Sequence, residues 1–333
     1  MLTKWVAPDV RFIPNFKGRG YGYFHASPEH LIGIVNKQED AEVRAGIWIT
    51  LWEIFLRGQL DPPLLLEKIL TAVKEEKDPL LLEYLTDKIN RIYWQFLTPG
   101  QRSLVSKDLD ETLFELMALE KDNSRKRTIF NCYRSVANSP KGVLNLIKFW
   151  SDEISLGLEV SERDHIQLAY ALAIREAEGH EKILAAQLNK VTNPDRKSEM
   201  QFVLQALSPD PVVRDRFFES LAKKENRTRE PWVLEAVRYL HHPLRAEYSK
   251  RYLKTSLQML EEVQSTGDIF FPKGWLDATL GDYQSASAAD VVRGYLNENA
   301  GLRPDLRNKL LQSADMLFRA ELITKKNLAA SPN

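Results

Sequence analysis

The sequence predicts an all-α protein, an irregular α-α superhelix preceded by a short extended segment. Helix-start signals recur along the chain, and the apolar residues between them repeat with a helical period. Glycines alternate with aromatic residues only near the beginning, and strand patterns are absent after residue 26. We therefore expect an extended segment at residues 1–26, helices over residues 27–323 and a flexible polar tail at residues 324–333.

The extended segment combines branched and aromatic residues with glycine. Val10, Phe12 and Ile13 precede a Pro-Asn turn, after which the chain reads GRGYGYFH. This composition favours the last strand of a β-domain, or a junction that leads out of one. The first residues show neither a signal-peptide core nor the start of a helical domain. We expect the chain to begin within a larger protein.

A capping residue followed by proline marks the expected helix starts. The side-chain oxygen accepts a free N–H of the first turn, and proline at the first helical position loses no hydrogen bond. The pattern occurs at Ser27-Pro28, Asp61-Pro62, Asp78-Pro79, Thr98-Pro99, Ser139-Pro140, Asn193-Pro194, Ser208-Pro209 and Asp210-Pro211.

The runs between these starts have the length of paired helices. Apolar-periodic stretches cover, among others, residues 64–73, 80–96, 104–119 and 166–174. Two such helices occupy about 40 residues, the size of a HEAT or armadillo unit, although no residue-level repeat is visible. The sequence therefore predicts a HEAT/armadillo-like solenoid with antiparallel neighbours.

The helix predicted at residues 41–58 is apolar around most of its circumference. A narrow stripe that includes Glu42, Glu53 and Arg57 is polar, so we expect other helices to enclose the remaining arc. Arg44 is the exception, because it projects from the apolar arc. Its charge needs a carboxylate partner or a route to water there, and the alternative is a side chain presented to a ligand cavity.

A second unusual stretch is TGDIFFPKGWLDATLGDYQS at residues 266–285. Phe271 and Trp275 flank Pro272, and three glycines are spaced along its length. We expect an aromatic loop that plugs the end of the solenoid or docks on another domain.

Composition excludes several classes of protein. Lys plus Arg and Asp plus Glu balance at 46 each, so no overall field attracts nucleic acid, and no apolar run spans a membrane. The single cysteine, Cys132, lies on an apolar helix face and rules out a disulfide framework. A soluble protein is expected, with cytoplasm and periplasm both open.

No catalytic motif is present in the chain. H-E-x-x-H is approached only at His180-Glu181, where the second histidine is replaced by leucine. His241 and His242 precede Pro243 and are interpreted as turn or capping residues. We therefore predict that this chain alone has no enzymatic activity and binds no metal.

Four stretches resemble the C-terminal helical domain of the aminopeptidase N family of zinc metallopeptidases, and the similarity covers essentially all of residues 12–322. They are PNFKGRGYGYF, RAGIWITLWEIFLRGQLDPPLLLEKIL, IFFPKGWLDATLGDYQSASAADVVRGYL and LRNKLLQSADMLFRA. The resemblance implies a noncatalytic domain that caps the active-site cavity and controls the access of peptides. It also implies that zinc is bound by a separate catalytic domain.

The resemblance further implies the partners, which are the catalytic and β-sandwich domains of the same parent protein and its peptide substrates. No family catalytic position matches this sequence. The residues that we expect near the substrate cavity or an interdomain interface are Arg44, Tyr21, Tyr23, Phe271 and Trp275. The alternatives are a free-standing α-solenoid that binds a protein or peptide partner, and a helical enzyme of unknown type.

Overall fold

The computed structural model describes residues 12–18, 20 and 22–330, and among these no β-strand forms. The all-α prediction is therefore confirmed. Contacts along the chain divide it into two compact units, Met1–Ile89 and Asn90–Asn333. The boundary falls near the end of α4, so the helices expected over residues 27–323 belong to two units.

The described residues of the first unit form a 3₁₀ turn and four helices. These are η1 (Phe16–Gly18), α1 (Pro28–Val35), α2 (Ala41–Leu56), α3 (Pro62–Glu75) and α4 (Pro79–Arg91), whose last residues belong to the second unit.

The second unit begins with η2 (Ile92–Phe96), a π-helical turn that continues directly from α4. Its first helices are α5 (Pro99–Leu119), α6 (Asn123–Val136), α7 (Pro140–Trp150), α8 (Glu162–Ile174), α9 (His180–Lys190), α10 (Pro194–Leu207) and α11 (Pro211–Ser220). The chain continues through η3 (Lys224–Arg227), α12 (Glu230–Leu240), η4 (Pro243–Arg245), α13 (Ala246–Ser249), η5 (Lys250–Tyr252), α14 (Leu253–Gln258), α15 (Leu260–Thr266), α16 (Phe271–Leu280), α17 (Ala286–Glu298) and α18 (Pro304–Ala330).

The proline signals place most helix starts correctly. Helices begin at Pro28, Pro62, Pro79, Pro99, Pro140, Pro194 and Pro211. Ser208-Pro209 is the exception, because it lies in the loop between α10 and α11. There the hydroxyl of Ser208 accepts the N–H of Asp210 at 3.2 Å, and Asp210 itself caps α11.

The enclosure predicted for α2 is confirmed. Asp40 caps the helix by accepting the N–H of Glu42 at 2.9 Å, and Gly58 ends it with a φ of 67° that favours glycine. Most of its apolar side chains are buried, among them Ile47, Trp48, Leu51, Ile54 and Phe55. The helix is therefore the core element of the first unit.

Arg44 pairs with a buried carboxylate. Its Nε and Nη2 donate to Glu76 at 2.8 and 2.6 Å, and its Nη1 donates to the carbonyls of Gln38 and Glu39. Burial by itself raises the pKa of Glu76, but Arg44 and nearby backbone N–H groups hold that pKa below its ordinary value. The carboxylate partner that the sequence requires for Arg44 is therefore Glu76.

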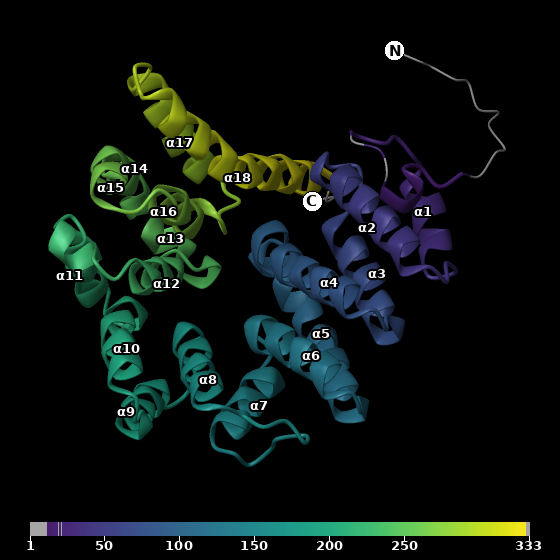
Figure 1. Cartoon of the computed structure of the whole chain (residues 1–333), viewed down its shortest axis with the longest axis horizontal. Coiled ribbons are helices and arrows are strands. Elements are labelled where there is room, and N and C mark those ends of the chain that lie inside the picture. Colours follow the sequence, from purple (N-terminus) through teal and green to yellow (C-terminus); the bar gives the residue numbers. More distant parts are fainter. Residues whose placement is uncertain (1–11, 19, 21, 331–333) are drawn as a thin grey trace. The chain divides into compact units, whose positions relative to one another are not determined.

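In the second unit, elements from the beginning and from the end of its sequence are in contact. Helices that are close in sequence, such as α7 and α8 or α8 and α9, pack together as a solenoid predicts (Figure 1). In addition, α18 packs against η2, and the side-chain amide of Gln284 donates to the carbonyl of Leu97, 187 positions away, at 3.0 Å. The unit is closed by this long-range contact, which the repeat pattern does not predict.

The segment at residues 1–26 shows no strand in its described part. Residues 1–11, 19 and 21 lie outside the described residues, and the described remainder contains η1, which packs against α2. A strand needs a neighbouring strand for its hydrogen bonds. The described residues offer none, so the chain turns onto α2 instead.

The stretch at residues 266–285 is a helix where we expected a loop. The carboxylate of Asp268 accepts the N–H groups of Phe270 and Phe271 at 2.7 and 3.1 Å, and Pro272 lies in the first turn of α16. These start signals outweigh the glycines, and they place Trp275 in the core.

Two other expectations about helix extent are wrong. The apolar-periodic run at residues 246–263, which predicts one continuous helix, is divided among α13, η5, α14 and α15. The helical region does not end at residue 323, because α18 continues to Ala330 and makes part of the expected tail helical. Thr324 and Lys325 support this extension through hydrogen bonds to Gln284 and Glu321.

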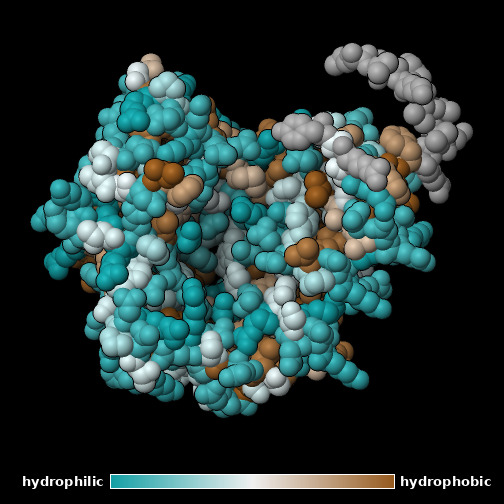
Figure 2. Space-filling view, in the orientation of Figure 1, coloured by the Kyte–Doolittle hydropathy of each residue, from teal (hydrophilic) through white to brown (hydrophobic). Residues whose placement is uncertain are grey.

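The visible face of the molecule is mostly hydrophilic, and its hydrophobic residues are scattered (Figure 2). The most exposed large hydrophobic side chains in the second unit include Leu104, Leu119 and Phe270. Of the helices formed by the described residues, none combines the length and apolar character that crossing a membrane requires.

The Arg44–Glu76 pair generates the first prediction. Replacing Arg44 with alanine leaves a carboxylate that is only 3% exposed without its cation, so the free energy of unfolding should fall by about 3 kcal/mol. Urea unfolding followed by circular dichroism measures this change. Lys68→Ala breaks the exposed pair with Glu67 and should change the free energy by at most ~0.5 kcal/mol. Equal small effects would contradict the role given to Arg44.

Candidate functional site

The second unit contains a pocket of about 610 Å³, which we call the main pocket. This volume lies within the usual range for small-molecule and peptide side-chain sites. The beginning, the middle and the end of the unit all contribute to it. Its lining includes Asn90, Trp94, Ser135, Arg163, Gln167, Glu199, Leu234, Glu235, Arg238, Tyr239, His242 and Asp282.

Trp94 forms the aromatic wall of the main pocket. It lies in the π-helical turn η2, and such turns occur frequently at functional sites. Its indole N–H donates to the carbonyl of Ser135 at 3.1 Å, and its ring meets the edge of His242 at 4.6 Å between centroids. The indole is therefore held in one orientation from two sides.

Two arginines fix the backbone behind Trp94. Arg102 donates to the carbonyls of Trp94 and Leu97 at 3.2 and 2.7 Å, and Arg175 donates to those of Ser135 and Ala137 at 2.6 Å each. Both guanidinium groups lie within 6 Å of the Trp94 ring centre, at 5.6 and 5.8 Å. Burial lowers the pKa of Arg175 to about 10, so it stays charged at neutral pH.

The opposite wall comes from α8, α10 and α12. The amide of Gln167 donates to Glu235 at 2.7 Å, and the hydroxyl of Tyr239 donates to Gln167 at 3.4 Å. The rings of Tyr170 and Tyr239 meet edge to face at 5.4 Å. α10 packs against both α12 and α8, which brings Glu199 to the same wall.

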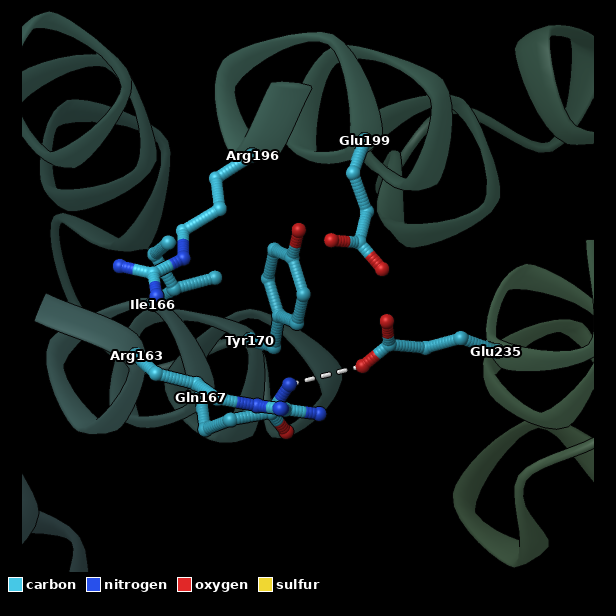
Figure 3. Close-up of a pocket in the computed structure, with 7 residues that line it drawn as sticks. All are labelled: Arg163, Ile166, Gln167, Tyr170, Arg196, Glu199 and Glu235. Atoms are coloured by element: carbon cyan, nitrogen blue, oxygen red, sulfur yellow. Dashed lines mark hydrogen bonds between the residues drawn. The ribbon is translucent and has the colours of Figure 1, made fainter. Parts of the chain in front are cut away.

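A smaller pocket of about 160 Å³ adjoins the main pocket and shares four of its residues. We call it the side pocket. Its lining comprises the shared residues Arg163, Gln167, Glu199 and Glu235, together with Ile166, Tyr170 and Arg196 (Figure 3).

Burial shifts the acidity of several groups at these pockets. The pKa of Glu199 is raised by burial and by the neighbouring charge of Glu235, and burial also raises the pKa of Asp282. The pKa of His242 is well below its ordinary value because of burial and the positive charge of Arg175. The site thus presents an uncharged imidazole together with carboxylates and exposed arginines.

The pockets offer aromatic faces and hydrogen-bonding groups that could bind a ligand. Ser135 donates to Asn90 at 2.6 Å, and Glu235 accepts from Gln167, so neither pair matches the nucleophile and base of a hydrolase. Aromatic faces beside hydrogen-bond donors and acceptors can hold a polypeptide segment.

Of the residues predicted from sequence, those that the structure describes do not line either of these pockets. Arg44 pairs with Glu76 in the first unit, where both line a separate pocket of about 300 Å³. Tyr23 lies under the guanidinium of Arg57 at 3.8 Å, and Tyr21 falls outside the described residues. Phe271 and Trp275 are 2% and 0% exposed and belong to the core.

Sequence reasoning missed the acidic wall. Glu199 and Glu235 lie on different helices, and each reads as an ordinary polar position of an amphipathic helix. The sequence did contain one signal for this wall. Gln167 and Tyr170 carry hydrogen-bonding groups and lie three positions apart, on one helix face, in the otherwise apolar run at 166–174. We interpreted that run only as packing.

The residues present do not fit the zinc site that the resemblance places in the parent enzyme. The sequence contains no H-E-x-x-H, and within the part of the chain that the structure describes no three His, Cys, Asp or Glu side chains come together as metal ligands.

Comparison with known proteins adds no assignment. No family profile matches the sequence, and no curated protein matches it significantly. The motif resemblance and the geometry of the two pockets are therefore the basis for proposing a function.

His241, which precedes His242 of the main pocket, generates a prediction about pH. It is 2% exposed, its Nδ1 lies 2.9 Å from the hydroxyl of Tyr283, and burial lowers its pKa to about 3. Below an unfolded-state pKa near 6.5 the unfolded chain binds the extra proton, so acidification destabilises the fold. At a pH of about 5.5 this one group should cost ~1.4 kcal/mol relative to a pH of about 7.5.

Urea unfolding at both pH values measures this loss. The free energy of unfolding that is lost on acidification should be ~1.4 kcal/mol smaller in His241→Gln than in the original chain, whatever the variant's absolute stability. His25→Gln changes an exposed histidine and should retain the full loss. The interpretation fails if His241→Gln and the original chain lose the same free energy on acidification.

Proposed function

We propose that this chain is the noncatalytic C-terminal helical domain of a zinc aminopeptidase of the aminopeptidase N family. In this proposal it caps the active-site cavity, binds a segment of the peptide substrate in the main pocket and controls access to the catalytic domain. Zinc and the catalytic groups belong to that other domain.

The observation that carries the proposal is the main pocket itself. It joins an immobilised indole, Trp94, to polar groups that can accept and donate hydrogen bonds, and most of these groups lie on helices. Peptide-binding sites need such groups, because a bound peptide brings unpaired backbone N–H and C=O groups. The motif resemblance supplies the identity of the parent enzyme.

Peptide binding is tested by calorimetric titration of the chain. The probes are blocked pentapeptides, acetyl-Ala-Ala-X-Ala-Ala-amide, with Lys, norleucine, Phe or Glu as X. At least one should bind saturably at one site per chain, and Trp94→Ala should weaken it about tenfold because a stacked aromatic face is lost. Phe270→Ala removes an exposed aromatic residue outside the pocket and should leave the affinity unchanged.

The noncatalytic assignment has its own test. The chain should bind no stoichiometric zinc and should not hydrolyse alanine p-nitroanilide, since it lacks a ligand set for zinc. Tight zinc at one ion per chain would overturn this assignment. Saturable peptide binding without any gain in activity on adding a catalytic domain of this family would favour a free-standing peptide-binding solenoid.

A further inference from the structure

The side pocket contains two carboxylates that together accept a single hydrogen bond from the protein. Glu199 makes no hydrogen bond or ion pair with any residue that the structure describes. Glu235 accepts one hydrogen bond, from Gln167. Figure 3 shows the two carboxylates pointing toward each other, with the Tyr170 ring beside them. Two carboxylates in one pocket repel, and a bound cation would remove that repulsion.

Tyr170 supplies a second, independent observation. Tyr170 lines the side pocket and is 1% exposed, and its buried hydroxyl has no hydrogen-bond partner. A buried hydroxyl without a partner carries a free-energy cost that a ligand can relieve. In Figure 3 the hydroxyl is directed to the side of the pocket on which Glu199 lies. A ligand that donates several hydrogen bonds at once could satisfy the hydroxyl and the two carboxylates together.

The chemistry of the cluster favours an organic cation over a metal ion. Calcium takes six to eight oxygen ligands, whereas the side pocket offers two carboxylates, one phenol and an amide that already donates to Glu235. A primary ammonium has three N–H donors and a guanidinium has five, and both form strong bonds to carboxylates. A volume of about 160 Å³ has room for several water molecules, and hence for the end of a long side chain.

We propose that Glu199, Glu235 and the Tyr170 hydroxyl bind the positively charged side chain of a lysine or arginine from a peptide held in the main pocket. The two pockets share the wall formed by Arg163, Gln167, Glu199 and Glu235, so one peptide can reach both. This inference rests on the proposed function and adds a preference for basic residues.

Two arginines at the same pocket have to be considered. Arg196 already donates to Glu162 at 2.8 Å, so its charge is engaged outside the acidic cluster. Arg163 is exposed, and it forms no ion pair with Glu199 or Glu235 in the structure. As a like charge it opposes the binding of a basic side chain, and Arg163→Gln should therefore tighten binding about threefold.

The test compares the Lys pentapeptide with its norleucine counterpart, which has a side chain of similar length without the charge. The Lys peptide should bind at least about tenfold more tightly, the effect of charged hydrogen bonds. Glu199→Gln/Glu235→Gln should abolish the difference. Glu219→Gln makes the same chemical change at an exposed position of α11 and should retain it.

Tyr170→Phe separates ligand binding from folding. Because the hydroxyl has no partner in the structure, its removal should not lower the unfolding midpoint. Binding of the Lys peptide should nevertheless weaken about threefold or more, and that of the norleucine peptide should not change. Unchanged Lys binding in Tyr170→Phe and in the double Glu→Gln variant would overturn the inference.

The outcomes distinguish this inference from the proposed function. Equal affinity of the Lys and norleucine peptides overturns the basic preference and leaves peptide binding intact. If no pentapeptide binds, peptide binding itself is overturned, and a titration with n-butylamine then tests the acidic cluster alone. Butylamine binding that the double Glu→Gln variant loses would support the cation site, and no butylamine binding would overturn it.

Discussion

Buried arginines that bind helix-end carbonyls are the interaction on which the rest of the structure depends. The last carbonyls of a helix have no partner inside it, and a buried helix end must find one elsewhere. Arg102 serves η2, Arg175 serves the end of α6, and Arg245 donates to Ala206 and Leu207 at the end of α10. Each guanidinium joins two elements because it reaches several carbonyls at once, and the pairs joined by Arg175 and Arg245 are not neighbours in sequence.

These arginine contacts between elements position the residues that line the pockets. Arg102 and Arg175 hold the backbone around Trp94, and α18 and Gln284 return to the same place from the other end of the unit. Groups far apart in sequence, from Asn90 to Asp282, thereby face one cavity. An open row of helices would place them on separate surfaces.

The sequence predicted the features that depend on interactions between residues close together in the chain. Helix starts and the enclosure of α2 follow from capping residues and apolar period, because both act within a few residues. The acidic wall of Glu199 and Glu235 and the arginine contacts could not be predicted. They are contacts between residues that lie far apart in the sequence. Arg175, for example, binds the carbonyl of Ala137, 38 positions away. For α16 the helix-start signals were present in the sequence, but we gave more weight to the glycines and predicted a loop.

The contact of α18 with η2 also has a mechanical consequence. In an open solenoid, force applied at the two ends can peel repeats away one after another, since each repeat contacts only its neighbours. In the second unit the contacting elements lie close to its two ends in sequence, so tension acts first on the junction between them. The helices between these elements are not stretched until that junction opens. The junction therefore protects the unit against mechanical unfolding from its ends.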